Sequence, residues 1–440
     1  EQSISVLFAK QDEDNFAQIF DDTLSDIGRD NSKIFSVLTD GGEQITLFDR
    51  ISDFITDNKD KFSKAIINKL TDFSFEHIFH EKFDFYATIF EYLIKDYNTN
   101  SGGTYAEYFT PHAVSKIMAR CLVSSQQQNV TIYDPSAGSG SLLMNLAHQI
   151  GEDKCTIYSQ DISQKSSNLL RLNLVLNDLV HSIHNIIKGN TILDPYHRQE
   201  LTDGSTRLEQ FDYIVSNPPF KLDFSDFSKD LDTKANKTRF FAGIPNVPKT
   251  KKESMAIYLM FLQHIMYSLK DNGKAAIVVP TGFITAQSGI DEKMLAGVVS
   301  MPSNIFANTG TNVSILFIDK ANKGDVVLVD ASNLGETIKD GKNQKIVLTH
   351  VEEDQIITTF NNKKAVVDFS VVVSYDDIKA KNYSLSAGQY FDVKIEYNDI
   401  TNEEFNAKLN EYKTTLHKLF QTSKTIEDDL ETQLAGLKYE

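Results

Sequence analysis

The segment "FDYIVSNPPF", residues 211–220, ends a run of aromatic and β-branched residues with an asparagine, two prolines and a phenylalanine. Adjacent prolines fix their own φ angles and donate no backbone hydrogen bonds. The plain alternative is a rigid turn that caps a strand. The amide and the aromatic ring, held by rigid neighbours, indicate a site of chemistry instead.

These four residues suit a reaction on an exocyclic amine of a nucleobase, which is a poor nucleophile because its lone pair is delocalised into the ring. Asn217 can accept one N–H bond with its side-chain oxygen, Pro218 can accept the other with its carbonyl, and Phe220 can stack on the base. Two acceptors would localise the lone pair for attack on a sulfonium methyl. The proton can leave afterwards, so acceleration would come mainly from positioning and preorganised dipoles.

Two features that follow neighbouring strands predict a nucleoside site. In "YDPSAGSGSLL", residues 133–143, a strand delivers Asp134, a glycine-rich turn follows, and a helix begins near Gly140. Glycines let the backbone approach a ligand, and a helix N-terminus offers N–H groups and a positive dipole end. The turn lacks the Lys and Ser/Thr of a P-loop and the third Gly of a dinucleotide fingerprint. Asp161 ends the next strand, where an acid can take both ribose hydroxyls, unless it is only a solvated loop aspartate.

Alternating strand and helix patterns predict an α/β fold with a doubly wound, mostly parallel sheet. Ligands of such sheets bind beyond the carboxyl ends of the strands. A turn-like link, "ANTGT", joins 297–306 to 312–320 and predicts a hairpin at one edge of the sheet. The expected strands are 130–135, 155–162, 211–217 and 274–280, and the expected helices are 112–123, 140–149, 163–177 and 254–270.

Both ends of the chain read as helical. Apolar residues at spacings of three and four run through 1–78 and again through 83–97. From Phe405, alternating steps of four and three follow the seam of a coiled coil, and eight of ten such positions are apolar. Such a stripe needs a partner, either its own domain or another chain. The positions are Phe405, Leu409, Tyr412, Leu416, Leu419, Ser423, Ile426, Leu430, Gln433 and Leu437.

The net charge of −17 is unlike that of a protein that grips DNA by itself. Either nucleic acid is no partner, or another subunit supplies most of the grip. The exception is the stretch from Lys221 to Lys252, where eight basic residues stand against four acids; it is either a solvated loop or a DNA-facing one. Cys121 and Cys155 are expected to be buried thiols in a reducing cytoplasm. No apolar run reaches 18 residues, so we expect no membrane span.

Five motifs in order resemble S-adenosylmethionine-dependent amino-methyltransferases, and more closely the modification (M) subunits of type I restriction–modification systems. They are "GGTYAEYFTPHAVSKIM" (102–118), "YDPSAGSGSLL", "GNTILDP" (189–195), "SNPPF" and "LKDNGKAAIVVPTGF" (269–283). The resemblance implies a seven-stranded methyltransferase sheet. It also implies three parts, namely a helical region over 1–78, a methyltransferase domain over 79–395 and a partner-binding helix over 396–440.

The resemblance also implies roles for individual residues. Asp161 would hold the ribose of S-adenosylmethionine, and Asn190 would sit near its adenine ring. The catalytic motif, typical of N6-adenine methylation, would be Asn217, Pro218, Pro219 and Phe220. The methionine end of the cofactor would be lined by Glu107, Tyr108, Phe109, Thr110, Pro111 and His112. The body of the cofactor would lie along Ser139, Gly140 and Ser141, with Asp134 and Gly138 shaping the loop.

As an M subunit the chain would be a cytoplasmic, adenine-specific DNA methyltransferase that receives a flipped adenine. A specificity (S) subunit would read the sequence, and a restriction (R) subunit and a second M subunit are further possible partners. One alternative is a related methyltransferase that acts on RNA or on protein glutamine, although helical regions at both ends disfavour a stand-alone enzyme. Another is a non-catalytic assembly scaffold, which the intact "NPPF" and Asp161 disfavour.

Overall fold

The chain divides into two compact units, Glu1–Phe391 and Asp392–Glu440. None of the described helices is both long and apolar enough to cross a membrane. The same residues contain no cluster of His, Cys, Asp and Glu that could hold a metal ion. The computed structural model describes residues 4–32, 36–38, 44–46, 50–72, 110–285, 294–306, 312–340, 343–391 and 401–435.

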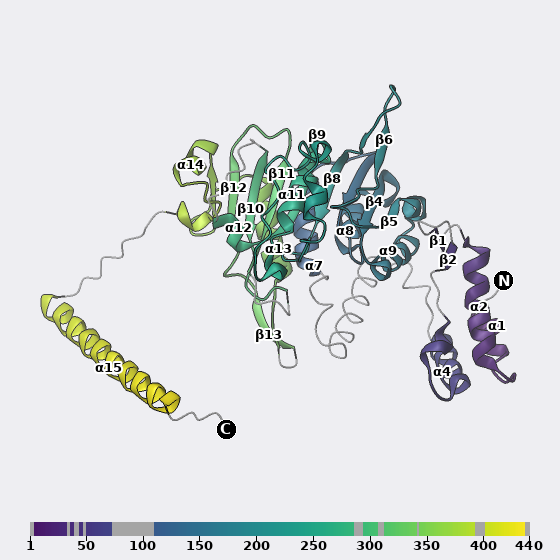
Figure 1. Cartoon of the computed structure of the whole chain (residues 1–440), viewed down its shortest axis with the longest axis horizontal. Coiled ribbons are helices and arrows are strands. Elements are labelled where there is room, and N and C mark those ends of the chain that lie inside the picture. The colour runs from purple at the N-terminus through teal and green to yellow at the C-terminus, as the bar shows by residue number, and fades with distance from the viewer. Residues whose placement is uncertain are drawn as a thin grey trace. The chain divides into compact units, whose positions relative to one another are not determined.

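A sheet of nine described strands forms the middle of the first unit, in the order β15-β12-β10-β11-β9-β8-β3-β4-β5 (Figure 1). The run from β9 to β5 is parallel throughout, so the carboxyl ends of these strands share one edge. The strands are β3 (Val130–Asp134), β4 (Cys155–Asp161), β5 (Ile186–Lys188), β8 (Phe211–Ser216), β9 (Leu269–Pro280), β10 (Leu295–Ser300), β11 (Val313–Asp319), β12 (Val326–Asp330) and β15 (Ser370–Val373).

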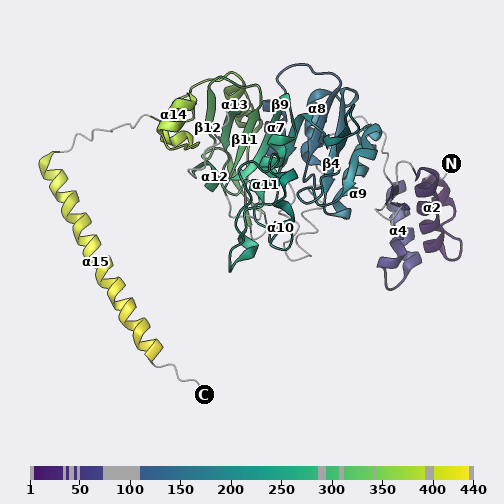
Figure 2. The same cartoon turned by 45° about the horizontal axis from the view of Figure 1, so that its top comes forward.

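Helices cover both faces of this sheet, as a doubly wound fold requires. Successive strand residues point to opposite faces, and Ile132 and Tyr133 accordingly belong to two different buried clusters. Figure 2 shows α8 and α9 at the β4 end of the sheet and α12, α13 and α14 at the β12 end. The helices are α7 (His112–Leu122), α8 (Ser141–Ile150), α9 (Gln164–Leu176), α11 (Tyr258–Tyr267), α12 (Thr281–Thr285), α13 (His350–Asn361) and α14 (Tyr375–Ala380).

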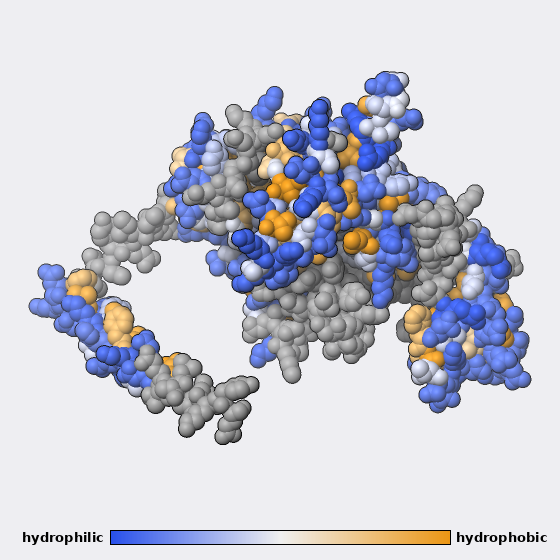
Figure 3. Space-filling model, viewed as in Figure 1, coloured by the Kyte–Doolittle hydropathy of each residue, from blue (hydrophilic) through white to orange (hydrophobic). Residues whose placement is uncertain are grey.

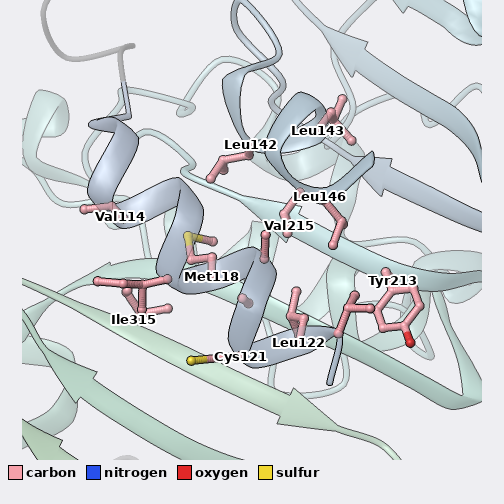
Figure 4. Close-up of a cluster of buried hydrophobic side chains, with 14 of the residues drawn as sticks. Val114, Met118, Cys121, Leu122, Leu142, Leu143, Leu146, Tyr213, Val215 and Ile315 are labelled. Carbon is pink, nitrogen blue, oxygen red and sulfur yellow. The ribbon is translucent and has the colours of Figure 1, made fainter. Parts of the chain in front are cut away.

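The larger buried cluster lies where α7 and α8 pack on the sheet. Met118 of α7 and Leu146 of α8 are fully buried with Val215 of β8 in this cluster (Figure 4). Cys121 lies in the same cluster and Cys155 is buried on β4, so both cysteines are buried as expected. This packing holds the ends of β3 and β8, and hence the segments that follow them, in fixed positions.

The α/β fold predicted from sequence is confirmed, but the size of the sheet and the place of the hairpin are wrong. β10 and β11 do pair antiparallel, yet β12 and β15 extend the sheet beyond them, so the hairpin lies inside it. Three strands of the sheet were missed, and all three are short and contain β-branched residues: "IIK" of β5, "VVLVD" of β12 and "SVVV" of β15. A short apolar run is ambiguous in sequence, and only its pairing in space makes it a strand. The link 307–311 lies outside the described residues.

The N-terminal region is helical in part. α1 (Ile4–Ala9), α2 (Phe16–Asp30) and α4 (Lys59–Thr71) bury a small cluster around Phe16 and Ile67. The helical pattern expected through 1–78 is interrupted at Asn58, which has a left-handed φ of 54° and precedes α4. A short hairpin of β1 (Ser36–Leu38) and β2 (Gln44–Thr46) was not predicted. The helix expected over 83–97 lies outside the described residues.

The second unit contains α15 (Asn402–Ala435), the predicted terminal helix. Its apolar stripe is exposed within the unit, with Leu416 at 50% and Leu430 at 53% of their accessible surface. Figure 3 shows apolar side chains among hydrophilic ones along this helix.

Two further hairpins belong to the first unit. They are β6 (Arg198–Glu200) with β7 (Thr206–Leu208), and β13 (Glu336–Asp340) with β14 (Asn343–Val347).

Candidate active site

The parallel strands bring four predicted site residues to one edge of the sheet. Asn217 follows β8, Asp134 ends β3, Asp161 ends β4 and Asn190 comes just after β5. In the register of β3 and β4, Asp134 lies opposite Ser159. The backbone N–H of Gly189 donates to the carbonyl of Asp161, 2.9 Å away. Residues far apart in sequence therefore form one row.

The glycine-rich turn between β3 and α8 depends on left-handed backbone at two glycines. Gly138 has a φ of 53° and Gly140 a φ of 86°, a region that glycine enters without strain. A Cβ on Gly140 would lie 2.2 Å from Cδ1 of the buried Leu170. Asn173 of α9 donates to the carbonyl of Ser139, at 2.8 Å. The turn is therefore held tightly against α9, while Ser141 begins α8.

Asp134 is a buried carboxyl group with one committed oxygen. Its Oδ1 accepts from the backbone N–H of Ser136 at 2.9 Å. Its Oδ2 is buried and has no hydrogen-bond partner in the described part of the protein. Burial raises the pKa of Asp134 to about 8, against the opposing effect of the Ser136 bond. A buried oxygen without a partner is costly. It can receive a donor from a ligand when the carboxyl group is ionised.

Asp161 ties the glycine-rich turn to the start of α9. Its Oδ2 accepts from the N–H of Gly138 at 2.9 Å, and its Oδ1 accepts from the N–H of Ser163 at 2.8 Å. Burial raises the pKa of Asp161, and these two bonds oppose the rise. Each carboxylate oxygen has a second lone pair for a further donor. The residue expected to hold a ribose thus also has a structural role that the sequence did not reveal.

Asn190 uses its side-chain oxygen to stabilise its own turn. Oδ1 accepts from the N–H groups of Ile192 and Leu193, both at 3.1 Å. Its amide nitrogen is then the natural atom for a contact with a ring. Two large apolar side chains next to these polar residues are exposed, Ile162 at 68% and Leu193 at 41%. Sequence reasoning missed both, although an apolar residue directly after a strand-ending acid is a usable signal.

The Asn217 side chain is oriented by a residue 107 positions earlier in the chain. Its Nδ2 donates to Oγ1 of the buried Thr110 at 3.1 Å. Amide nitrogen and oxygen lie on opposite sides of the group, so Oδ1 turns away from Thr110. The next residues, Pro111 and His112, start α7, with Pro111 at the cap position.

One small cavity contains residues from three of the predicted motifs. Its walls come from Thr110 of the motif 102–118, from the glycine-rich turn, and from Asn217 of "SNPPF". Glu107, Tyr108 and Phe109 lie outside the described residues. The lining residues are Thr110, Asp134, Ser136, Ala137, Ser139, Ser141, Leu142 and Asn217.

Two contacts around the Asn217 motif were not predicted. Ser216 and Ser136 join the end of β8 to the glycine-rich turn, with their hydroxyl oxygens 2.8 Å apart. The half-buried ring of Phe220 meets the edge of Tyr258, the first residue of α11, with centroids 6.5 Å apart at 81°. The buried Pro218 lies between these contacts in sequence. Both contacts fix the geometry of the motif from neighbouring elements.

The basic stretch after Phe220 is more than a solvated loop. Segment 221–257, which connects this motif to α11, contains the short helix α10 (Ser228–Leu231) and its own buried cluster. The cluster includes Phe224, Leu231 and Phe240 and packs on Met260. Its lysines Lys221, Lys249 and Lys251 are exposed. The segment is therefore a packed body that presents basic side chains.

The chain is similar to known methylases over most of its length. A family model described as N-6 DNA Methylase matches residues 81–399. The type I restriction enzyme MpnII methylase subunit of Mycoplasma pneumoniae is 27% identical over 361 residues, which is 79% of this chain and 64% of that protein. The HindI methylase subunit of Haemophilus influenzae is 24% identical and covers 96% of this chain and 93% of its own.

A solved structure supports the same comparison at the level of fold. The type I restriction-modification system methyltransferase subunit from Streptococcus thermophilus has a TM-score of 0.68. It is 22% identical and covers 88% of this chain and 80% of its own. At this identity the likeness concerns the fold alone. The chain spans just under two thirds of the length of the Mycoplasma relative.

Proposed function

Because this chain belongs to the N-6 DNA methylase family, we propose that it transfers a methyl group from S-adenosylmethionine to N6 of adenine in DNA. The observation that carries the proposal is the 3.1 Å bond from Asn217 Nδ2 to Thr110 Oγ1. This bond sets the rotation of the amide and leaves Oδ1 as the acceptor for an incoming amine. A hydrogen-bond acceptor is what N6 of adenine requires.

In the proposed reaction Asn217 Oδ1 and the carbonyl of Pro218 accept the two N–H bonds of N6. The lone pair on that nitrogen is then localised and directed at the methyl group. The φ angles of Pro218 and Pro219 are fixed on both sides of the Pro218 carbonyl, so little reorganisation is needed at the moment of transfer. The Phe220 ring stacks on the flipped base, while the nearly perpendicular ring of Tyr258 packs against it. The proton on N6 leaves after transfer.

The residues at the strand ends fit S-adenosylmethionine, which supplies a methyl group on a positively charged sulfur. The buried Asp134 Oδ2 offers an acceptor that no described residue uses. The turn at Gly140 has no room for a side chain, because Leu170 packs against it. The flanking residues Ser139 and Ser141 line the cavity. We assign the ribose to Asp161 and the adenine ring to Asn190 and the exposed Ile162. The rest of the proposed site is Thr110, Pro111, His112, Gly138, Ser139, Gly140 and Ser141, with Glu107, Tyr108 and Phe109.

We further propose that the chain works as the M subunit of a type I restriction–modification complex in the cytoplasm. An S subunit reads the DNA sequence, which is consistent with the net charge of −17 on this chain. The exposed apolar stripe of α15 packs on helices of that subunit. The basic segment 221–257 contacts the DNA backbone near the flipped adenine, whose extrusion costs a few kcal/mol. An R subunit and a second M subunit complete the assembly.

The same proposal assigns three parts to the chain, a helical region over 1–78, the methyltransferase domain over 79–395 and the S-binding helix over 396–440. The proposed test is co-purification with the neighbouring gene product as the S subunit, followed by mapping of methylated adenines in DNA. We expect Asn217→Ala to lower the methylation rate by about 10²–10³-fold or more, as for a lost transition-state hydrogen bond.

Cofactor binding measured by calorimetry should be retained in Asn217→Ala. Asn68→Ala, which changes an exposed asparagine of α4, is the matched control and should methylate at the parent rate. Methylation of DNA by Asn217→Ala at the parent rate would contradict the mechanism. Methyl transfer to RNA or to protein glutamine with no transfer to DNA would replace the substrate assignment.

A further inference from the structure

Arg239 is a buried cation in the basic segment 221–257. Its side chain is only 3% exposed, and burial lowers its pKa to about 10. Its guanidinium lies 4.4 Å from the centroid of the Phe240 ring. Among the described residues, it donates to two neutral acceptors, a backbone carbonyl and an imidazole nitrogen. Placing a cation here is expensive, which indicates a specific role for these contacts.

The first contact leads to the glycine-rich turn. Arg239 Nη2 donates to the carbonyl of Thr191 at 2.7 Å. The Thr191 hydroxyl in turn donates to the carbonyl of Pro135 at 2.7 Å. Thr191 is 3% exposed, so neither bond competes with bulk water. Arg239 is thus linked through one residue to the position immediately after Asp134.

The second contact leads to the strand before the turn. Arg239 Nε donates to His264 Nδ1 at 3.1 Å, and His264 Nε2 lies 3.3 Å from the hydroxyl of Tyr133. A nitrogen that accepts carries no proton, so the proton of His264 is on Nε2 and is donated to Tyr133. Burial and the Arg239 charge keep the pKa of His264 well below its usual value, so the ring stays neutral.

These two routes end on the neighbours of one residue. Tyr133 and Pro135 flank Asp134, the buried carboxyl group whose Oδ2 has no partner among the described residues. Both routes start at Arg239, which precedes Phe240 of the buried cluster in segment 221–257. The same cluster includes Ile192, the residue after Thr191. Movement of segment 221–257 therefore shifts the hydrogen bonds to Tyr133 and Pro135, the two neighbours of Asp134. Movement of Tyr133 or Pro135 in turn shifts Arg239.

We infer that Arg239 is a positioning residue that couples segment 221–257 to the glycine-rich turn through Thr191 and His264. The inference rests on the proposed function, in which the turn binds the cofactor and the segment faces DNA. Occupancy of the turn orders the segment, and by thermodynamic reciprocity an ordered segment favours occupancy. The enzyme thereby prepares its DNA-facing surface when the cofactor is bound.

The experiment is hydrogen–deuterium exchange on the full chain, with and without saturating S-adenosylhomocysteine as an unreactive probe. In the parent we expect slower exchange both in 135–141 and in 236–243, the latter by about 5-fold or more, within the usual range of coupling. Thr191→Val keeps the shape of the side chain but removes its bond to Pro135. In this variant the probe should still slow exchange in 135–141. It should slow exchange in 236–243 by less than about 2-fold.

Thr206→Val, which makes the same change on the exposed strand β7, is the matched control and should behave like the parent. Arg239→Lys removes the guanidinium from which both routes start, and it should also lose protection of 236–243. Melting temperatures check that each variant is folded. Full protection of 236–243 in folded Thr191→Val and Arg239→Lys would overturn the inference. Binding of the probe with no protection of 236–243 in the parent would do the same. Failure of the probe to bind the parent would instead refute the cofactor assignment, and the inference with it.

Discussion

The carboxyl edge of the sheet and helix α15 differ in where their side chains find partners. At the edge, polar groups bond to one another within the unit, as between Gly138 and Asp161 or between Thr110 and Asn217. On α15, the side-chain bonds of Thr414 and Thr425 return to the helix itself, and the apolar stripe is exposed within its unit. The comparison teaches that polar groups at this edge find partners within one chain, whereas a helix of this kind gains most of its stability from packing.

The largest effect should come from charging the α15 stripe. Replacing Leu416 and Leu430 together by Lys puts two charges on the surface proposed to pack on the S subunit, where burial of an unpaired charge is strongly unfavourable. We expect loss of the complex in size-exclusion runs with the S subunit. Cofactor binding should be unchanged, because the proposed cofactor site and α15 lie in different units.

The matched control places Lys on the other side of the same helix, at Thr414 and Gln421. This variant should still form the complex, since the charge and the helix content are similar. A protein without residues 402–435 that still binds the S subunit and methylates adenine would contradict the assignment of α15 to that partner. The comparison between the two regions would then fail at the helix.

The next effect tests how tightly the edge is built. Gly140→Ala meets both the left-handed φ, which costs about 1–2 kcal/mol, and the buried Leu170 side chain 2.2 Å away, which adds about 1–3 kcal/mol. Gly204→Ala is the control, because Gly204 has a similar φ of 78° and no atom within 4 Å of the added Cβ. Denaturant unfolding should show the larger loss for Gly140→Ala; equal losses would mean that the turn relaxes.

Removal of the Asp161 carboxylate should weaken the edge by a smaller amount. Asp161→Ala removes the acceptor for Gly138 and the proposed acceptor for the ribose, so calorimetry should show cofactor binding weaker by about 1.5–3 kcal/mol. Asp203→Ala is a useful control because Asp203 also accepts from a backbone N–H two residues later, on an exposed hairpin. Equal cofactor affinity of Asp161→Ala and the parent would remove Asp161 from the site.

The same contrast explains what the sequence could predict. Helices α7, α8 and α9 and the ends of β3, β4 and β8 follow from local periodicity and turn residues, and the structure confirms them. The bond between Thr110 and Asn217 could not be predicted, because it joins residues brought together only by the packed sheet. The buried position of Arg239 was hidden for the same reason, since a basic residue among lysines reads as solvated. Pairing of β12 and β15 likewise depends on long-range contacts.

The smallest predicted effect concerns Asp134 and pH. Because burial raises its pKa to about 8 in the folded protein, the folded state holds a proton that the unfolded state has released above about pH 4. Stability from this group is therefore fully present at low pH and is lost as pH rises through 8. Between pH 6.5 and 7.5 the loss should be at most about 1.4 kcal/mol.

Asp134→Asn isolates this contribution, because an amide keeps an acceptor for Ser136 and does not titrate in this range. Denaturant unfolding at the two pH values should show a smaller fall in stability for the variant than for the parent. The difference between the two slopes reports the titration of Asp134 together with its electrostatic interaction with Asp161. Identical changes of stability with pH in the two proteins would mean that Asp134 is already ionised in the folded protein. Its buried Oδ2 would then accept a hydrogen bond even when no ligand is bound.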